Sequence, residues 1–234
     1  MTNIVLDIVE RQVKSWQKQR NSAKTTRALP AHFAQNITIS RQFGAGGLAL
    51  AQALGQRLGF SVWDNELVQA IAVETGASEK ILRALDEHHR GGIEDAVQGM
   101  LLGSTYTRSA YLERMMKLIT TIAAHGNNVI VGRGSQYVVA EALHVRVVCP
   151  LDIRVTRYAE KTSLSTREAL EEIKRNDADR QAFLRQHYNQ DNSNPEHYGL
   201  VVNTGVFSIE ELTDLIASVY TAKYADKAPQ PLQR

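Results

Sequence analysis

Five short apolar runs alternate with segments of helical periodicity, and no other feature constrains the fold of this chain as strongly. The runs are residues 37–39, 60–63, 129–131, 145–148 and 200–202. The helical patterns are residues 48–54, 66 onward, 78–125 with breaks near Gly91-Gly92 and Gly103, 135–142, 152–162, 165–188 and 208–220. Parallel strands need a crossover connection, usually a helix, and are covered on both faces. The alternation therefore predicts an α/β fold with a central, parallel, five-stranded sheet.

The two ends of the chain depart from this pattern. Residues 3–19 carry apolar side chains at helical spacing, and the polar stretch from Asn21 to Pro30 predicts a linker. We therefore expect an N-terminal helix and linker at 1–35, a main domain at 36–222 and a disordered tail at 223–234. The N-terminal helix is expected to pack on the main domain or on a second subunit.

Composition narrows the classes of partner. The 234 residues are 43% hydrophobic and 22% charged, as in globular proteins, and the net charge of +2 is too small to indicate a nucleic-acid partner. Cys149 is the one cysteine, which excludes an intramolecular disulfide, and its place after an apolar run predicts a buried side chain. No apolar stretch is long enough to span a membrane, and the first residues do not resemble a signal peptide. We expect a cytoplasmic protein without a membrane partner.

A glycine-rich loop, Gly44-Ala45-Gly46-Gly47, separates the first predicted strand from its helix. Such a loop presents backbone N–H groups in a concave nest, and the helix N-terminus adds partial positive charge, so the site favours phosphate. Glycines also allow close approach of an anion to the backbone. The alternative is that they only form a tight turn and allow the helix to pack closely on the strand.

The loop departs from the standard P-loop, Gly-x-x-x-x-Gly-Lys-[Ser/Thr]. In that alignment Arg41 takes the place of the first glycine, Gly47 that of the lysine and Leu48 that of the hydroxyl residue. Backbone recognition of a phosphate survives these changes. Phosphoryl transfer is harder, because electrostatic stabilisation of the moving group supplies most of the catalysis.

Five segments in order resemble the cytidylate kinase-like proteins, a branch of the P-loop nucleoside monophosphate kinases. They are the loop string Ile37 to Gly47, the strand and acid Phe60 to Asp64, the strand and Gly-Arg-Gly turn Asn128 to Gly134, the Asp-x-x-Arg helix Ile173 to Arg180, and the last strand Tyr198 to Thr204. The resemblance covers about residues 36–220. It implies a nucleoside-kinase-like three-layer sandwich with a helical insertion that binds a monophosphate and a mobile lid.

The resemblance also implies an activity: transfer of a phosphoryl group from ATP, with Mg²⁺, to a nucleotide or similar small phosphorylated acceptor. Three departures from the family pattern bear on it. Cytidylate kinases have lysine where this chain has Gly47, and an acid that helps to read the base where it has Gly134. Relatives with this loop often have arginine where this chain has Leu48. Cytidine specificity is therefore not implied.

Three candidate residues follow predicted strands. Arg41 could bring a guanidinium to the phosphates and partly replace the lysine, or could pair with a nearby carboxylate. Asp64 could hold Mg²⁺ or orient the acceptor, or could cap the helix that follows. Arg133, between two glycines, could bind the acceptor phosphate or be an ordinary exposed turn residue.

Further candidates lie on predicted helices. Asp177 and Arg180 share a helix face, and the resemblance implies that Arg180 closes over the transferred group while Asp177 orients the arginines or the acceptor. Surface ion pairing is the alternative. Arg154 and Arg157 are candidate nucleotide-side cations, or surface residues beside an apolar stripe. His88, His89, His187 and His197 lack metal-ligand spacing. The stretch with Tyr106, Tyr111, Met115 and Met116 predicts core or a dimer interface.

These observations leave three hypotheses. The first is an ATP-dependent kinase, with Gly44–Gly47 holding the donor and Arg41, Arg133 and Arg180 supplying positive charge. The second is a regulatory protein that binds a nucleotide without efficient turnover, which the missing lysine and Leu48 favour. The third is a structural interaction protein that forms a homo-oligomer, such as a homodimer, through the N-terminal helix and residues 91–125.

Overall fold

The computed structural model describes residues 2–23, 35–73, 75–83, 87–102 and 110–225, and its sheet is the predicted one. All five strands are parallel, in the order β2-β3-β1-β4-β5. They are β1 Asn36–Arg41, β2 Ser61–Trp63, β3 Asn128–Val131, β4 Leu143–Val148 and β5 Leu200–Asn203. The prediction of a five-stranded parallel sheet is therefore confirmed.

Helices cover both faces of the sheet and form two further layers. They are α1 Thr2–Ala23, α2 Gly47–Leu58, α3 Asn65–Val73, α4 Thr75–Arg83, α5 Glu87–Leu102, α6 Ala110–Ala124, α7 Ser135–Val138, α8 Leu151–Thr162, α9 Thr166–Tyr188 and α10 Ile209–Ala225, with a 3₁₀ turn at Pro195–His197. Successive side chains of a strand point to opposite faces. Ile39 and Val145 accordingly pack with α2 and α10, and Ile130 packs on the other face with α6 and the end of α9.

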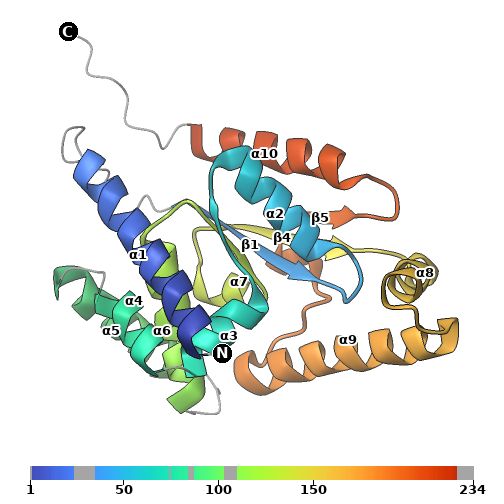
Figure 1. Ribbon diagram of the computed structural model, residues 1–234, viewed down its shortest axis with the longest axis horizontal. Coiled ribbons are helices and arrows are strands. Elements are labelled where there is room, and N and C mark those ends of the chain that lie inside the picture. The colour runs from blue at the N-terminus through green and yellow to red at the C-terminus, as the bar shows by residue number, and fades with distance from the viewer. Residues whose placement is uncertain (1, 24–34, 74, 84–86, 103–109, 226–234) are drawn as a thin grey trace, which may run out of the picture.

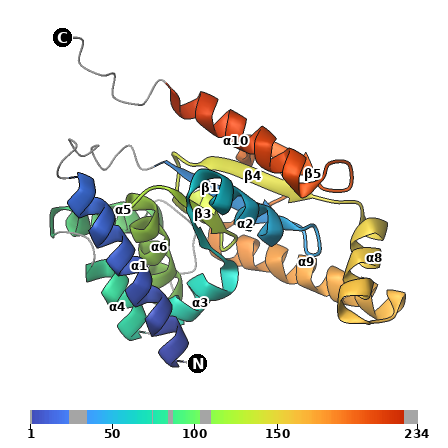
Figure 2. The same ribbon diagram turned by 45° about the horizontal axis from the view of Figure 1, so that its top comes forward.

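The N-terminal helix α1 is part of the main domain. It packs against α4 and α3 at one end of the molecule (Figures 1 and 2). Trp16 is buried, with its ring 3.8 Å from that of His125 and 5.7 Å from that of Trp63. The Gln12 side chain donates to the Ser61 hydroxyl at 2.9 Å. Of the two predicted docking partners for this helix, the structure shows the main domain. Residues 24–34 of the predicted linker lie outside the described residues.

Three predicted boundaries are wrong. Helix α5 runs through Gly91-Gly92 because Ile93, Val97 and Leu101 form a buried stripe that packs in the main core, which offsets the helical cost of glycine. Helix α7 ends at Val138, and β4 begins at Leu143. Helix α10 reaches Ala225, so residues 223–225, assigned to the tail, are helical. The predicted break at Gly103 and residues 226–234 lie outside the described residues.

Helices α8 and α9 pack together as a hairpin, here called the lid hairpin, at the end of the molecule opposite α1 (Figures 1 and 2), and α9 contains residues 173–180, the predicted lid helix. Ser165 and Glu168 form a reciprocal capping box that starts α9. The first part of α9 packs on α8 through Ala169 and Ile173, and its end joins the main core through Tyr188. One helix therefore connects the hairpin to the body of the domain. Within the described helices, none has the length and apolar composition needed to cross a membrane.

Candidate functional site

The glycine-rich loop connects the end of β1 to the start of α2. Gly44 and Gly46 have positive φ angles, 76° and 75°, which side-chain-bearing residues rarely adopt. Gly46 is the N-cap of α2 and has no side chain with which to cap the helix. The N–H groups of the first turn of α2 are therefore available to an anion, and the helix dipole favours negative charge there.

Arg41 occupies the space next to Gly47, where the P-loop lysine would stand. A Cβ atom at Gly47 would lie only 2.7 Å from Arg41 Cβ and 2.8 Å from its Cγ. The guanidinium continues to Gly132 after β3, where an added Cβ would overlap Nη1. Burial, then the like charges of Arg180, Arg133 and Arg146, lower the pKa of Arg41 to about 9. The side chain of Arg41 therefore leaves no room for a lysine side chain at position 47.

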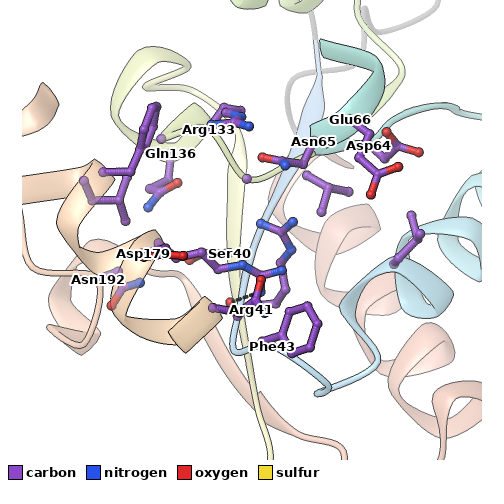
Figure 3. A pocket seen from close by; sticks show the side chains of 18 residues that line it. Ser40, Arg41, Phe43, Asp64, Asn65, Glu66, Arg133, Gln136, Asp179 and Asn192 are labelled. Carbon is purple, nitrogen blue, oxygen red and sulfur yellow. Dashed lines mark hydrogen bonds between the residues drawn. The ribbon is translucent and has the colours of Figure 1, made fainter. Parts of the chain in front are cut away.

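A cavity of about 320 Å³ opens where β1, β2 and β3 end. Side chains from β1, the loop after β3, α3 and α9 point into it (Figure 3). Its cations are Arg41, Arg133 and Arg180, and its acids are Asp64, Glu66 and Asp179. Ligands of open parallel sheets bind at this edge. The structure therefore brings together three of the predicted cations with the predicted acid Asp64.

Asp64 and Arg133 line the cavity from adjacent strands. Asp64 Oδ1 accepts from the Leu67 N–H at 2.8 Å, so the predicted helix cap is present, and the residue borders the cavity as well. Arg133 has a positive φ of 54° and its guanidinium carbon lies 5.0 Å from the centroid of the Phe183 ring. It is half-buried beside the cavity and is not an ordinary exposed turn residue.

Arg180 and Asp177 connect the lid helix to the glycine-rich loop. The guanidinium carbon of Arg180 lies 5.1 Å from the centroid of the Phe43 ring, and its Nη1 donates to the Arg41 carbonyl at 3.2 Å. Asp177 Oδ1 accepts from the Phe43 N–H at 2.7 Å, and Oδ2 pairs with Arg154 at 2.6 Å. The alternative of an ordinary surface ion pair is wrong for Asp177, since both its oxygens bind groups far away in the sequence.

Arg154 and Arg157 lie behind the loop. The Arg154 side chain is 6% exposed, and it donates to the carbonyls of Cys149 and Phe43, each at 3.0 Å. It is therefore not a surface residue, and its position fits support of the loop better than direct contact with a nucleotide. Arg157 is exposed and donates to the Thr204 carbonyl at 3.0 Å. Cys149 is buried, as predicted.

The departure from the family pattern at Gly134 has a steric reason. A Cβ atom there would lie 2.5 Å from Cζ of Tyr188, at the end of α9, and φ is 70°. The Tyr188 hydroxyl donates to the Arg133 carbonyl at 2.8 Å. An acidic side chain at this position would collide with the tyrosine, so this chain cannot use one there.

Sequence reasoning missed two polar residues, one that binds a residue of the cavity wall and one that lines the cavity. Arg146 on β4 is buried, its Nη1 donates to the Ser40 hydroxyl at 2.8 Å, and burial lowers its pKa. An arginine inside the apolar run 145–148 was the available signal, because charged side chains are rarely buried without a specific reason. Gln136 on α7 lines the cavity and is also buried. It follows the Gly-Arg-Gly turn by two residues, but a single glutamine carries no sequence signal.

Other predicted residues lie elsewhere. Met115 and Met116 are buried in the main core, so this part of the stretch is core and not a dimer interface. Tyr106 lies outside the described residues, and the side chains of His88 and His89 are likewise not described. Within the described part of the chain, no three His, Cys, Asp or Glu side chains are grouped as metal ligands.

Comparison with known proteins agrees with this architecture. The family model described as the cytidylate kinase-like family matches residues 36–206. A cytidylate kinase from Methanobrevibacter smithii is 29% identical over 182 residues, covering 77% of this chain and 95% of the relative. The crystal structure of an uncharacterized protein from Eubacterium ventriosum superposes with a TM-score of 0.64 at 18% identity, over 81% of this chain and 99% of that one.

A second curated relative matches over a shorter stretch. A uronate isomerase from Corynebacterium glutamicum is 30% identical over 137 residues, or 57% of this chain. The match spans only 26% of that relative's own length.

Proposed function

The chain belongs to the cytidylate kinase-like family, and on that premise we propose that it transfers a phosphoryl group from ATP to a small phosphorylated acceptor. The observation that carries this proposal is the position of Arg41. Its side chain fills the space next to Gly47 and reaches a cavity that it shares with Arg133 and Arg180. A cluster of half-buried, like-charged guanidinium groups is costly unless an anion binds between them.

The roles follow from the geometry. The loop Gly44–Gly47 and the first turn of α2 would bind the phosphates of the donor. Arg41 would stabilise the charge on the transferred group, and Arg180, on the lid helix, would close over it. Arg133, which lines the cavity on the β3 side, would bind the phosphate of the acceptor.

Asp177 would act through other groups. It connects the Phe43 N–H of the loop with Arg154 of α8, so it couples the lid hairpin to the donor loop. We therefore propose Asp177 and Arg154 as positioning residues. Arg157, which binds the Thr204 carbonyl at the end of β5, is retained as a candidate contact to the donor nucleotide.

The oxygen ligands near the cavity fit Mg²⁺. Magnesium prefers carboxylate and phosphate oxygens and is usually held by one or two carboxylates together with substrate phosphates. Asp64 borders the cavity with one oxygen engaged by the helix N-terminus, and Glu66 lies beside it. These acids would supply the protein part of the site. When bound with ATP, the ion neutralises charge on the phosphates.

Ligand-induced stabilisation followed by an ADP assay tests the proposal. The protein is melted with ATP, ADP, CMP, dCMP, AMP, GMP or UMP, with and without Mg²⁺. A ligand at 100 times its Kd stabilises the folded state by about 2.7 kcal/mol. We expect a rise with ATP and with one monophosphate, and ADP formation that falls at least about 100-fold in Arg180→Ala. No shift with any nucleotide at millimolar concentration would contradict the proposal.

A regulatory nucleotide-binding protein is the second candidate, and Leu48 favours it. This side chain is 43% exposed and lines the cavity where a P-loop hydroxyl would bind magnesium. Under this alternative the melting temperature rises with ATP, but no ADP forms with any of the acceptors.

A further inference from the structure

Gln136 presents an unusual buried amide to the cavity. It lies on the first turn of α7, is 6% exposed, and lines the cavity next to Arg133 (Figure 3). Across the described residues, neither its amide oxygen nor its amide nitrogen has a hydrogen-bond partner of normal geometry. Burial raises the pKa of the adjacent Tyr137 to about 12, and a hydrogen bond with the Gln136 side chain offsets part of that rise. Because a donor lowers the pKa of a phenol, this contact involves the amide nitrogen, and its geometry is not that of a normal hydrogen bond, while the amide oxygen has no partner among the described residues.

An amide in this state needs an explanation. Buried polar groups are almost always hydrogen-bonded, because each donor or acceptor left without a partner carries its full desolvation penalty. The side chain borders a cavity large enough for a small molecule and is not enclosed in packed core. The missing partner can therefore be a ligand.

The chemistry of the cavity limits what that ligand group can be. The phosphate of the acceptor has Arg133 available and the transferred group has Arg41 and Arg180, so neither needs a neutral amide. Asp64, Glu66 and Asp179 disfavour a further negative charge in the same cavity. A glutamine amide combines a donor and an acceptor, so it is suited to a neutral edge that offers one of each.

The rigidity of the wall around Gln136 adds to this argument. Tyr188 packs on Gly134 and donates to the Arg133 carbonyl, which fixes the turn from which α7 starts. Arg133 and Gln136 are thus held on one short segment of fixed geometry. A ligand bound through both groups is recognised by its phosphate and by a second group at a set separation.

We propose that Gln136 is a specificity-determining residue that binds a neutral amide-type edge of the acceptor, a group with a donor and an acceptor side by side. This inference rests on the proposed function. The acceptor is then a phosphorylated compound that carries such an edge, as the rings of UMP and CMP do. A sugar phosphate without a ring of this kind would leave the amide unsatisfied and bind more weakly.

Binding measurements on three proteins test the inference: the wild type, Gln136→Met, and Gln52→Met as a control on the exposed side of α2. UMP, CMP, AMP, GMP and ribose 5-phosphate are titrated into each by calorimetry. We expect at least one nucleotide to bind wild type about 10-fold or more tightly than ribose 5-phosphate. In Gln136→Met that ratio falls close to one while ribose 5-phosphate binds as before, and Gln52→Met behaves as wild type.

Melting without ligand gives an independent readout. Replacing the unsatisfied amide by an apolar side chain of similar length removes a desolvation penalty, so Gln136→Met should melt a few degrees above wild type. A lower melting temperature would indicate a structural amide and overturn the inference. Equal affinity of wild type for all five ligands, or an unchanged affinity ratio in Gln136→Met, would overturn it too.

ADP formation separates this inference from the proposed function. ADP formation with an acceptor whose preference is unchanged in Gln136→Met would overturn the role of Gln136 and leave the kinase proposal standing. Binding preferences that depend on Gln136 without ADP formation would overturn the kinase proposal and support the role of Gln136 in binding.

Discussion

At the scale of single residues, two glycines of the site are each matched to a large side chain that packs against it. Gly47 has no side chain because the stem of Arg41 occupies its space, and Gly134 has none because Tyr188 does. Each position therefore requires glycine because a large side chain from elsewhere in the sequence packs against it. Substitution of either glycine tests the pairing.

Gly47→Ala should destabilise the fold by about 1–3 kcal/mol, because its Cβ would collide with Arg41. The matched control is Gly99→Ala in α5, where a Cβ meets no atom within 4 Å and should stabilise the helix by about 0.5–1 kcal/mol. Urea unfolding of the two variants measures both effects. Similar effects of the two substitutions would contradict the close approach of Arg41 to Gly47.

His144 gives the protein a pH dependence of known sign. Burial, and then the charge of Lys223, lower its pKa from the usual 6.5, and its Nδ1 lies 2.7 Å from the Thr38 hydroxyl. The unfolded chain therefore binds a proton at higher pH than the folded one, and stability falls as pH drops through 6.5 toward the folded pKa. The free energy of unfolding should decline less between pH 7.5 and pH 5.5 in His144→Gln. Parallel declines would exclude this contribution.

The sequence was informative about some site residues and silent about others. Arg41, Asp64, Arg133 and Arg180 follow from their places at strand ends and on the lid helix, and all four line the cavity. Gln136 could not be predicted, since its significance depends on its burial at the wall of the cavity. The alternative of a surface position for Arg154 was wrong, because the periodicity of a helix does not reveal that a neighbouring loop covers the face that carries this residue.

At the scale of elements, Asp177 connects α9 to the glycine-rich loop and to α8. Asp177→Asn leaves the guanidinium of Arg154, 6% exposed, without its carboxylate. We expect a loss of about 2–4 kcal/mol in the free energy of unfolding, below the largest losses for buried pairs because the Asp177 side chain is 30% exposed. Asp214→Asn, in an exposed pair with Arg57, should cost less than about 1 kcal/mol. Equal costs would contradict the connecting role.

The helix α1 should contribute to the stability of the whole domain. Trp16 is buried against Trp63 and His125, so Trp16→Ala should cost about 3–5 kcal/mol. Glu10→Gln breaks the exposed pair with Lys80 and should leave the melting temperature nearly unchanged. Thermal unfolding of both variants checks this. A melting temperature of Trp16→Ala close to that of the wild type would contradict a contribution of α1 to the stability of the domain.

Strands were easier to predict than helix boundaries, and the reason is physical. The central strands β1, β3 and β4 contain short, mostly apolar runs because both of their faces are largely buried, whereas helix ends depend on tertiary contacts. Gly91-Gly92 predicted a break, yet the buried stripe of α5 keeps the helix continuous. At α10, Tyr224 is buried and its hydroxyl donates to the Glu141 carbonyl, which extends the helix beyond its predicted end.

At the scale of the whole molecule, the order of five weak motifs predicted more than any one of them. The family match over residues 36–206 and the strand order β2-β3-β1-β4-β5 agree with that prediction. The identity of the acceptor could not be predicted, because it depends on how three strand ends and a distant helix enclose one cavity. The cytoplasmic location and the homodimer stay predictions.

The most direct test of the account is to follow the γ-phosphoryl group of ATP itself. Wild-type protein, ATP, Mg²⁺ and the monophosphate that stabilises the fold most are monitored by ³¹P NMR. The account predicts equal amounts of ADP and a phosphorylated acceptor, and a rate at least about 100-fold lower in Arg41→Met. ATP and acceptor that remain unchanged, or ADP that appears only with inorganic phosphate, would contradict it.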